Sequence, residues 1–212
     1  MPARHNDRRT EQQRLAIAEE AARLMLEHGL PDFRAAKARA LERLGLRNNA
    51  PLPSNEEIAT ALAARQRIFQ ADTQTGLIER LRREALAVME QLQTFNPRLV
   101  GAVLNGSATD HSAIDLHLFA DAPEQVALEM DQLGYAYRSI QLRHRWRRGE
   151  HEQLPGYRVY ARDSECLLSV FPDKRRGHPP LSPVDGRPMK RAGARELAAL
   201  LETSAGENLS AV

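Results

Sequence analysis

Hydrophobic positions recur at helical spacing through the first 95 residues, and this spacing predicts four helices. The first helix ends at Gly29, and a linker with two prolines runs from Arg47 to Pro53. Ser54 and Glu57 have the spacing of a capping box, so a third helix should begin there. A fourth helix is expected over residues 75–95. The N-terminal part is therefore predicted to be helical.

Beyond residue 96 the pattern changes from helical to extended. Strand-like alternation or short apolar runs replace the helical spacing, with one helix capped by Asp121 and a last one over residues 193–202. Four helices followed by a strand-rich half favour an α+β fold, N-terminal helices followed by a small mixed sheet, over a doubly wound α/β sheet. The strands are expected at Leu99–Leu104, Ala113–Phe119, Tyr135–Trp146, Tyr157–Arg162 and Cys166–Phe171.

These elements suggest three regions: a helical extension with its linker (1–53), an α+β domain with its leading helices (54–202) and a flexible tail (203–212). A hydrophobic content of 42% supports a real core. The single cysteine, Cys166, excludes an internal disulfide and is predicted to be a core residue because its neighbours are apolar. Since no segment approaches the roughly 20 apolar residues of a membrane span and no signal peptide is evident, we expect a cytoplasmic protein without a membrane partner.

Glycine, hydroxyl and carboxylate groups come together beside apolar strands between Leu104 and Phe119. Asn105-Gly106-Ser107 predicts a turn whose backbone N–H groups and hydroxyl can approach the phosphates of a nucleotide. Asp115 lies on the strand that follows. A carboxylate there can hold Mg²⁺ or another divalent metal, and a further carboxylate from a neighbouring strand would complete such a site.

This segment resembles the minimal nucleotidyltransferase (DNA polymerase β-like) superfamily, which has glycine and serine after an apolar residue and then an acid-apolar-acid strand. The resemblance implies a nucleotidyltransferase-like sheet that binds a nucleoside triphosphate. The wider chain is also similar to small bacterial proteins described as containing a nucleotidyltransferase domain. The residues that carry this similarity are Ala21–Met25, Ala36-Lys37, Leu52–Ile58, His117–Asp121 and Leu181–Met189.

The chain departs from the superfamily pattern at the metal-binding carboxylates. Ala113 stands where the first acid is expected, and the last acid aligns near Leu167, with Glu165 two residues before it. Asp115 and Glu165 are therefore the candidate catalytic residues of an incomplete set. Asp115 and His117 lie two residues apart, and imidazole with carboxylate would suit a transition metal better than Mg²⁺. A histidine that only faces solvent or a hydrogen-bond partner is the alternative for His117.

Positive charge is concentrated in the C-terminal half. Residues 138–191 carry thirteen Lys and Arg against six Asp and Glu, although the net charge of the whole chain is only +2. Alternation along a strand would place Arg143, Arg145 and Arg147 on one face, beside Trp146. Such a face could bind a triphosphate or an RNA backbone, or could be a charged edge strand that prevents aggregation.

Three functions fit these patterns. The first is a nucleotide-binding, nucleotidyltransferase-like protein that transfers a nucleotidyl group to an unknown acceptor, or a descendant of such an enzyme with a degenerate metal site. The second is a non-catalytic module that binds RNA or an acidic partner through its basic face. The third is an interaction protein that forms a homo-oligomer through its N-terminal helices. The residues leave open whether the protein is an enzyme.

Overall fold

The computed structural model describes residues 3–210 except positions 31, 48 and 70. The chain forms two compact units, one of residues 1–74 with 109–111 and the other of residues 75–108 with 112–212. The described residues contain seven α-helices and a five-stranded mixed sheet. The expected α+β class is therefore confirmed.

The first unit is a small helical bundle of α1 (Ala3–His28), α2 (Phe33–Arg43) and α3 (Asn55–Phe69). The capping box before α3 is confirmed: the Ser54 N–H donates to Glu57 Oε2 at 2.7 Å, and the Glu57 N–H donates to Ser54 Oγ at 3.1 Å. The buried core of this unit includes Ile17, Ala21, Leu24, Ala36, Ala40, Ile58 and Leu62.

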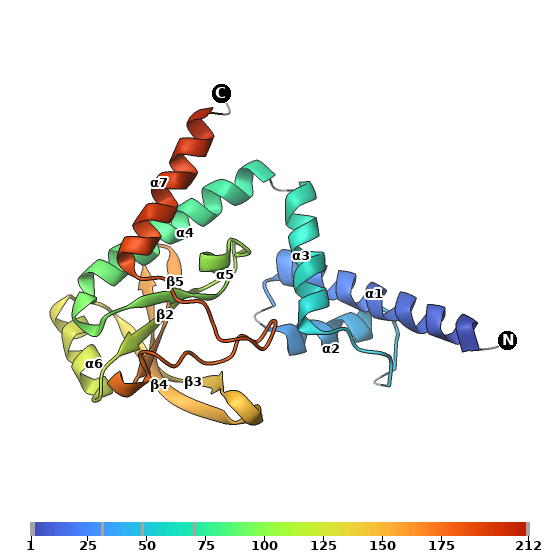
Figure 1. Ribbon diagram of the computed structural model, residues 1–212, viewed down its shortest axis with the longest axis horizontal. Helices are drawn as coiled ribbons and strands as arrows, with labels where there is room; N and C mark the ends of the chain where they lie inside the picture. Colours follow the sequence, from blue (N-terminus) through green and yellow to red (C-terminus); the bar gives the residue numbers. More distant parts are fainter. Residues whose placement is uncertain (1–2, 31, 48, 70, 211–212) are drawn as a thin grey trace. The chain divides into compact units, whose positions relative to one another are not determined.

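The second unit is built on the sheet (Figure 1). The strand order is β1-β2-β5-β4-β3. Neighbouring strands are antiparallel except β2 and β5, which are parallel. The five strands are β1 (Arg98–Val100), β2 (Ile114–Phe119), β3 (Tyr137–Arg145), β4 (His151–Ala161) and β5 (Ser164–Phe171).

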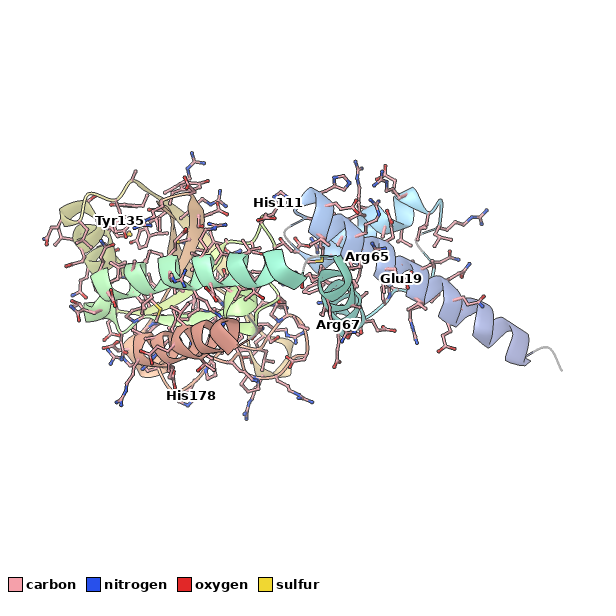
Figure 2. The ribbon with its side chains drawn as sticks, turned by 90° about the horizontal axis from the view of Figure 1, so that it is seen from above. Glu19, Arg65, Arg67, His111, Tyr135 and His178 are labelled. Atoms are coloured by element: carbon pink, nitrogen blue, oxygen red, sulfur yellow. The ribbon has the colours of Figure 1, made fainter. Side chains whose placement is uncertain are left out.

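Helices cover one face of this sheet. They are α4 (Ala71–Gln91), whose greater part belongs to this unit, with α6 (Pro123–Gln132) and α7 (Ala194–Ser210). Figure 2 shows α4 and α7 crossing the same side of the unit, and side chains of both helices enter its hydrophobic core. Fully buried core residues include Met89, Leu116, Met130, Leu168 and Leu197. Cys166 is buried in this core, as expected.

The expected strand over Leu99–Leu104 is wrong after its first residues. The extended backbone stops at Val100, and the short helix α5 (Gly101–Asn105) follows. Gly101 has a φ of 71°, a left-handed value that ends a strand. The Arg82 guanidinium donates to the carbonyls of Val103 and Leu104, which lie at the end of α5. Apolar side chains alone could not distinguish this partly buried helical turn from a strand.

Two predictions about helix ends are also wrong. Asp121 does not cap α6, because Ala122 is the N-cap and Pro123 begins the helix; the Asp121 carboxylate instead accepts the backbone N–H of Asp173 at 3.1 Å. The last helix continues to Ser210, so residues 203–210 of the expected tail are helical. Positions 211–212 lie outside the described residues.

The units also divide the chain later than the boundary expected after Pro53. Helix α3 belongs to the first unit because Ile58 and Leu62 share a core with Ile17 of α1. Capping and linker residues mark where a helix begins, but burial decides which core the helix joins. None of the described helices is both long enough and apolar enough to cross a membrane.

Candidate functional site

The sheet has a polar face, opposite the face that the helices cover. On β2 the buried core positions Ile114, Leu116 and Leu118 alternate with Asp115 and His117. Successive strand side chains point to opposite faces, so Asp115 and His117 share the polar face, as their spacing predicts. The candidate functional residues Asp115 and His117 therefore lie on this polar face.

Asp115 lies where three segments meet. It pairs with Val100 of β1 and Leu167 of β5, and its Oδ2 lies 2.9 Å from where a Cβ on Gly101 would stand. Glycine at position 101 therefore makes room for this carboxylate. Burial raises the pKa of Asp115 to about 6, and the nearby charge of Glu165 adds to the increase.

Glu165 is the second candidate carboxylate, and the structure brings it to the same face as Asp115. Leu167 is the β5 partner of Asp115, and Glu165 comes two residues earlier on that strand. The Glu165 carboxylate forms an ion pair with Arg158 of β4 at 3.0 Å. The two candidate catalytic residues therefore lie on adjacent strands, close enough for one charge to affect the other.

His117, the other candidate metal ligand, is buried, with only 2% of its surface exposed. Its Nδ1 accepts the Nε–H of Arg191 at 3.1 Å, and its ring packs on Phe171 with the centroids 4.5 Å apart. Burial lowers its pKa well below the ordinary value, and the Arg191 charge lowers it further. His117 is a hydrogen-bond partner in this structure, which agrees with the structural alternative and not with metal binding through Nδ1.

Metal ligands are few in the part of the chain that the structure describes. It contains no group of three or more His, Cys, Asp or Glu side chains suited to hold a metal ion. Asp115 and Glu165 remain as a pair of carboxylates. A pair is enough for Mg²⁺ when the ion keeps several waters and also binds the phosphates of a substrate.

Residues 172–193 contribute side chains to one end of the polar face. Arg191 lies over the rings of Phe119 and Phe171, at 5.0 and 5.2 Å, and also donates to the carbonyls of Arg175 and Arg176. Burial lowers the pKa of Arg191 to about 10, with the Arg98 charge contributing. His144, whose pKa burial lowers to about 4, donates to or accepts from Ser169 Oγ at 3.0 Å. This end of the face is a packed core.

The other end of the polar face contains side chains that are half-buried or exposed, and we call it the open zone. Its members lie on one face because they are paired with each other across neighbouring strands, or stand two residues from a paired position on the same strand. They are Arg138, Arg158, Tyr160, Glu165, Leu167 and Asp115.

The expected phosphate-binding turn has a different role. Gly106 is the C-cap of α5, with a φ of 79°, and both its N–H and that of Ser107 donate to the Ala102 carbonyl. Asn105 is the exposed last residue of the helix. These two N–H groups therefore already have acceptors at the carbonyl end of a helix, where the negative end of the helix dipole disfavours a phosphate.

The three arginines proposed for phosphate binding do not share one strand face. Arg147 lies in the 3-10 turn η2 (Arg147–Gly149), and only Arg143 and Arg145 belong to β3. Because successive strand residues point to opposite faces, Arg143 and Arg145 lie on the other face of β3 from His144 and therefore away from Asp115. Arg145 also donates to the Ser182 carbonyl at 3.4 Å, whereas Arg143 is exposed. The structure therefore separates Arg143 and Arg145 from the carboxylate pair.

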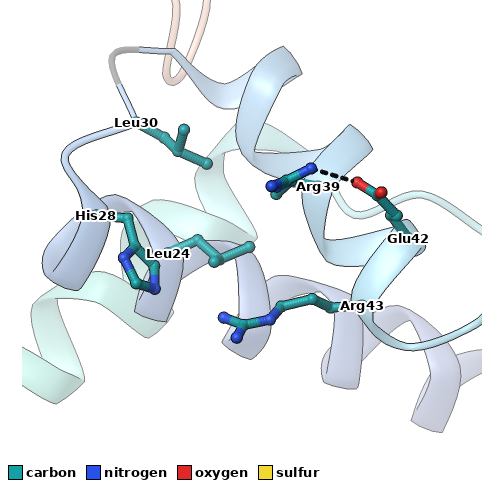
Figure 3. Close-up of a pocket in the computed structure, with 6 residues that line it drawn as sticks. All are labelled: Leu24, His28, Leu30, Arg39, Glu42 and Arg43. Carbon is teal, nitrogen blue, oxygen red and sulfur yellow. Dashed lines mark hydrogen bonds and ion pairs between the residues drawn. The ribbon is translucent and has the colours of Figure 1, made fainter.

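A surface hollow of about 480 Å³ lies in the first unit, and its lining residues come from positions 24–43 of the chain. Figure 3 shows Leu24 and His28 of α1 on one side and Arg39 and Arg43 of α2 on the other. Arg39 forms an ion pair with Glu42 at 2.7 Å. None of the site residues predicted from the sequence lines this hollow.

Sequence reasoning missed four residues of the polar face and its border: Gly101, Arg138, Arg158 and Tyr160. Gly101 interrupts the apolar run from Leu99 to Leu104, and a glycine within a strand-like run was the available signal. Arg138, Arg158 and Tyr160 lie in predicted strands. Only the pairing between strands shows that their side chains are on the same face as Asp115.

Comparison with known proteins adds no family assignment. The chain matches no protein-family model, and no curated protein has a significantly similar sequence. The resemblance to nucleotidyltransferases therefore stays a prediction from the motif residues.

Proposed function

We propose that this is a nucleotidyltransferase-like protein that binds a nucleoside triphosphate with a divalent cation in the open zone of its sheet. The observation that carries the proposal is the juxtaposition of Asp115 and Glu165 on adjacent parallel strands. The raised pKa of Asp115 supports it, because a cation between the two carboxylates would relieve their repulsion and favour their ionised forms.

The residues fit Mg²⁺ or Mn²⁺ as carboxylate ligands of a hard cation. Asp115 and Glu165 would hold the ion, which would neutralise phosphate charge and orient the triphosphate. Gly101 would keep Asp115 in position, because any side chain there would press against the Asp115 carboxylate. The packed end of the polar face, around Phe171 and His117, would close the site on one side.

Nucleotidyl transfer is a further step that this site supports less well. The two-metal arrangement of the resembled superfamily uses an acid at the position that Ala113 occupies here. Glu165 also forms an ion pair with Arg158, so its carboxylate would have to bind the cation and Arg158 at the same time. Nucleotide binding is therefore the proposal, and turnover is a separate outcome of its test.

Calorimetric titration with each nucleoside triphosphate, with and without Mg²⁺ or Mn²⁺, tests the proposal. We expect metal-dependent binding that Asp115→Asn abolishes. Asp163→Asn is the matched control, because Asp163 is exposed in the turn between β4 and β5. Release of pyrophosphate in the same samples reports transfer. The absence of metal-dependent nucleotide binding to the wild-type protein would overturn the proposal.

A second candidate is a non-catalytic module that binds RNA or an acidic partner. The exposure of Arg143 on β3, the edge strand of the sheet, favours it. RNA held by this edge should bind with an affinity that falls steeply with salt. Fluorescence anisotropy with a single-stranded RNA tests it: Arg143→Gln should weaken binding and Asp115→Asn should not. The opposite pattern would assign RNA binding to the carboxylate site.

Self-association through the N-terminal helices is also a proposal. Leu15 of α1 is 59% exposed, whereas Ile17, Ala21 and Leu24 of the same helix are buried. Light scattering of the wild type and Leu15→Ser tests it. A dimer that Leu15→Ser converts to a monomer supports the proposal, and a monomeric wild type at high concentration contradicts it.

A further inference from the structure

One row of side chains crosses the open zone from a carboxylate to two arginines. Asp115 of β2 pairs with Leu167 of β5, Leu167 with Arg158 of β4, and Arg158 with Arg138 of β3. Neighbouring strands lie about 4.8 Å apart, so the row spans roughly 14 Å. It therefore has an end that attracts cations and an end that attracts anions, with an apolar side chain between them.

The two arginines at the anion-attracting end stand directly opposite each other. Like charges at such a pair of positions are destabilising. Glu165 compensates Arg158, whose side chain is 42% exposed. Among the residues that the structure describes, no carboxylate forms an ion pair with Arg138, which is exposed. The pair therefore has a net positive charge directed to solvent, as a phosphate-binding surface requires.

Tyr160 adds an aromatic surface beside this row. It lies two residues after Arg158 on the same face, opposite Glu165, and is 62% exposed. A tyrosine this exposed contributes little to the core, yet its ring offers a flat apolar surface. Aromatic side chains on an open sheet face are suited to stack on nucleobases.

We propose that Arg138, Arg158 and Tyr160 form the recognition half of the nucleotide site. The arginines donate to the phosphates, and the nucleobase stacks on the Tyr160 ring. This inference rests on the proposed function. It transfers phosphate recognition from Arg143, Arg145 and Arg147 to Arg138 and Arg158, which lie on the opposite face of the sheet from Arg143 and Arg145. It also predicts weak selectivity among bases, because every base has a stacking face and Tyr160 has a single hydroxyl.

Calorimetry with Mg-ATP and with inorganic tripolyphosphate tests the inference. Arg138→Gln should weaken the binding of both probes about tenfold, while Arg143→Gln, on the other face of β3, should leave both unchanged. Tyr160→Leu should weaken ATP about tenfold and leave tripolyphosphate unchanged. Tyr160→Phe should keep wild-type affinity for ATP, because the stacking ring remains. Circular dichroism melting checks that each variant folds.

The possible failures are distinguishable. If the wild type binds Mg-ATP and Asp115→Asn does not, but Arg138→Gln and Tyr160→Leu bind ATP like the wild type, the inference is overturned and the proposed function stands. If the wild type binds no nucleotide, both are overturned. Loss of tripolyphosphate binding in Arg143→Gln instead of Arg138→Gln would assign the phosphates to the other face of the sheet.

Discussion

Replacement of Asp115 by asparagine should make the stability of this protein less dependent on pH. The folded structure raises the pKa of Asp115 from its ordinary value of 3.8 to about 6, mainly through burial and partly through the charge of Glu165. Ionising this carboxyl therefore costs the folded state roughly 3 kcal/mol more than it costs the unfolded chain. Asparagine has nearly the same shape and no such cost.

The direction in which stability changes with pH depends on whether the folded or the unfolded state binds the Asp115 proton more tightly. Because the pKa of Asp115 is higher in the folded state, its stabilising contribution is fully present below about pH 4 and is lost as the pH rises through about 6. The wild type should lose roughly 3 kcal/mol of unfolding free energy over this window that Asp115→Asn does not lose.

Urea denaturation at a series of pH values between about 4 and about 8 measures the effect. The free energy of unfolding of Asp115→Asn, minus that of the wild type, should rise by roughly 3 kcal/mol toward neutral pH. Any fixed cost of burying the amide cancels in this comparison. Asp163→Asn, in an exposed turn, is the control and should follow the wild type at every pH.

A difference that stays constant with pH would refute the reasoning, because it would mean that Asp115 titrates normally in the folded protein. NMR titration of the Asp115 carboxyl carbon gives the same quantity directly. In Glu165→Gln its pKa should fall only part of the way to 3.8, because burial is the larger cause.

Three further predictions concern stability and reactivity. Gly156→Ala should destabilise the protein by roughly 1–3 kcal/mol in urea denaturation, since its Cβ would press against the Leu168 carbonyl oxygen; unchanged stability would show that β4 and β5 can separate there. Ser54→Ala should cost about 1 kcal/mol by the same assay, through loss of the hydrogen bond to the Glu57 N–H, and Ser54→Thr should cost less. Cys166, buried and with its pKa raised to about 12, should react with thiol reagents only after unfolding; rapid labelling of the native protein would contradict this.

Local patterns along the chain were sufficient to predict much of the fold. The Ser54 capping box, the extended Ala113–Phe119 segment and the burial of Cys166 depend on interactions within a few residues or on a simple apolar pattern, so they could be read directly. The predictions from sequence were wrong where a residue that fits a local motif interacts instead with a residue far away in the chain. Aspartate is a common helix-capping residue, but the Asp121 carboxylate accepts the backbone N–H of Asp173, 52 positions away.

The candidate site shows the same division. Spacing alone predicted that Asp115 and His117 share a strand face, because alternation is a property of one strand. Spacing could not predict that Arg191 and Phe171 surround His117, that Gly106 and Ser107 cap a helix, or that Arg138 and Arg158 align with Asp115.

By itself, therefore, the sequence determined the α+β class, most helices and strands, and the position of Asp115 on a strand. Only the tertiary structure decided which side chains accompany it. The physical reason is that helical and strand periodicities are local, whereas the register between β2, β5, β4 and β3 depends on packing between residues far apart in the chain. A shift of one residue in that register would place Arg138 and Arg158 on the other face, away from Asp115.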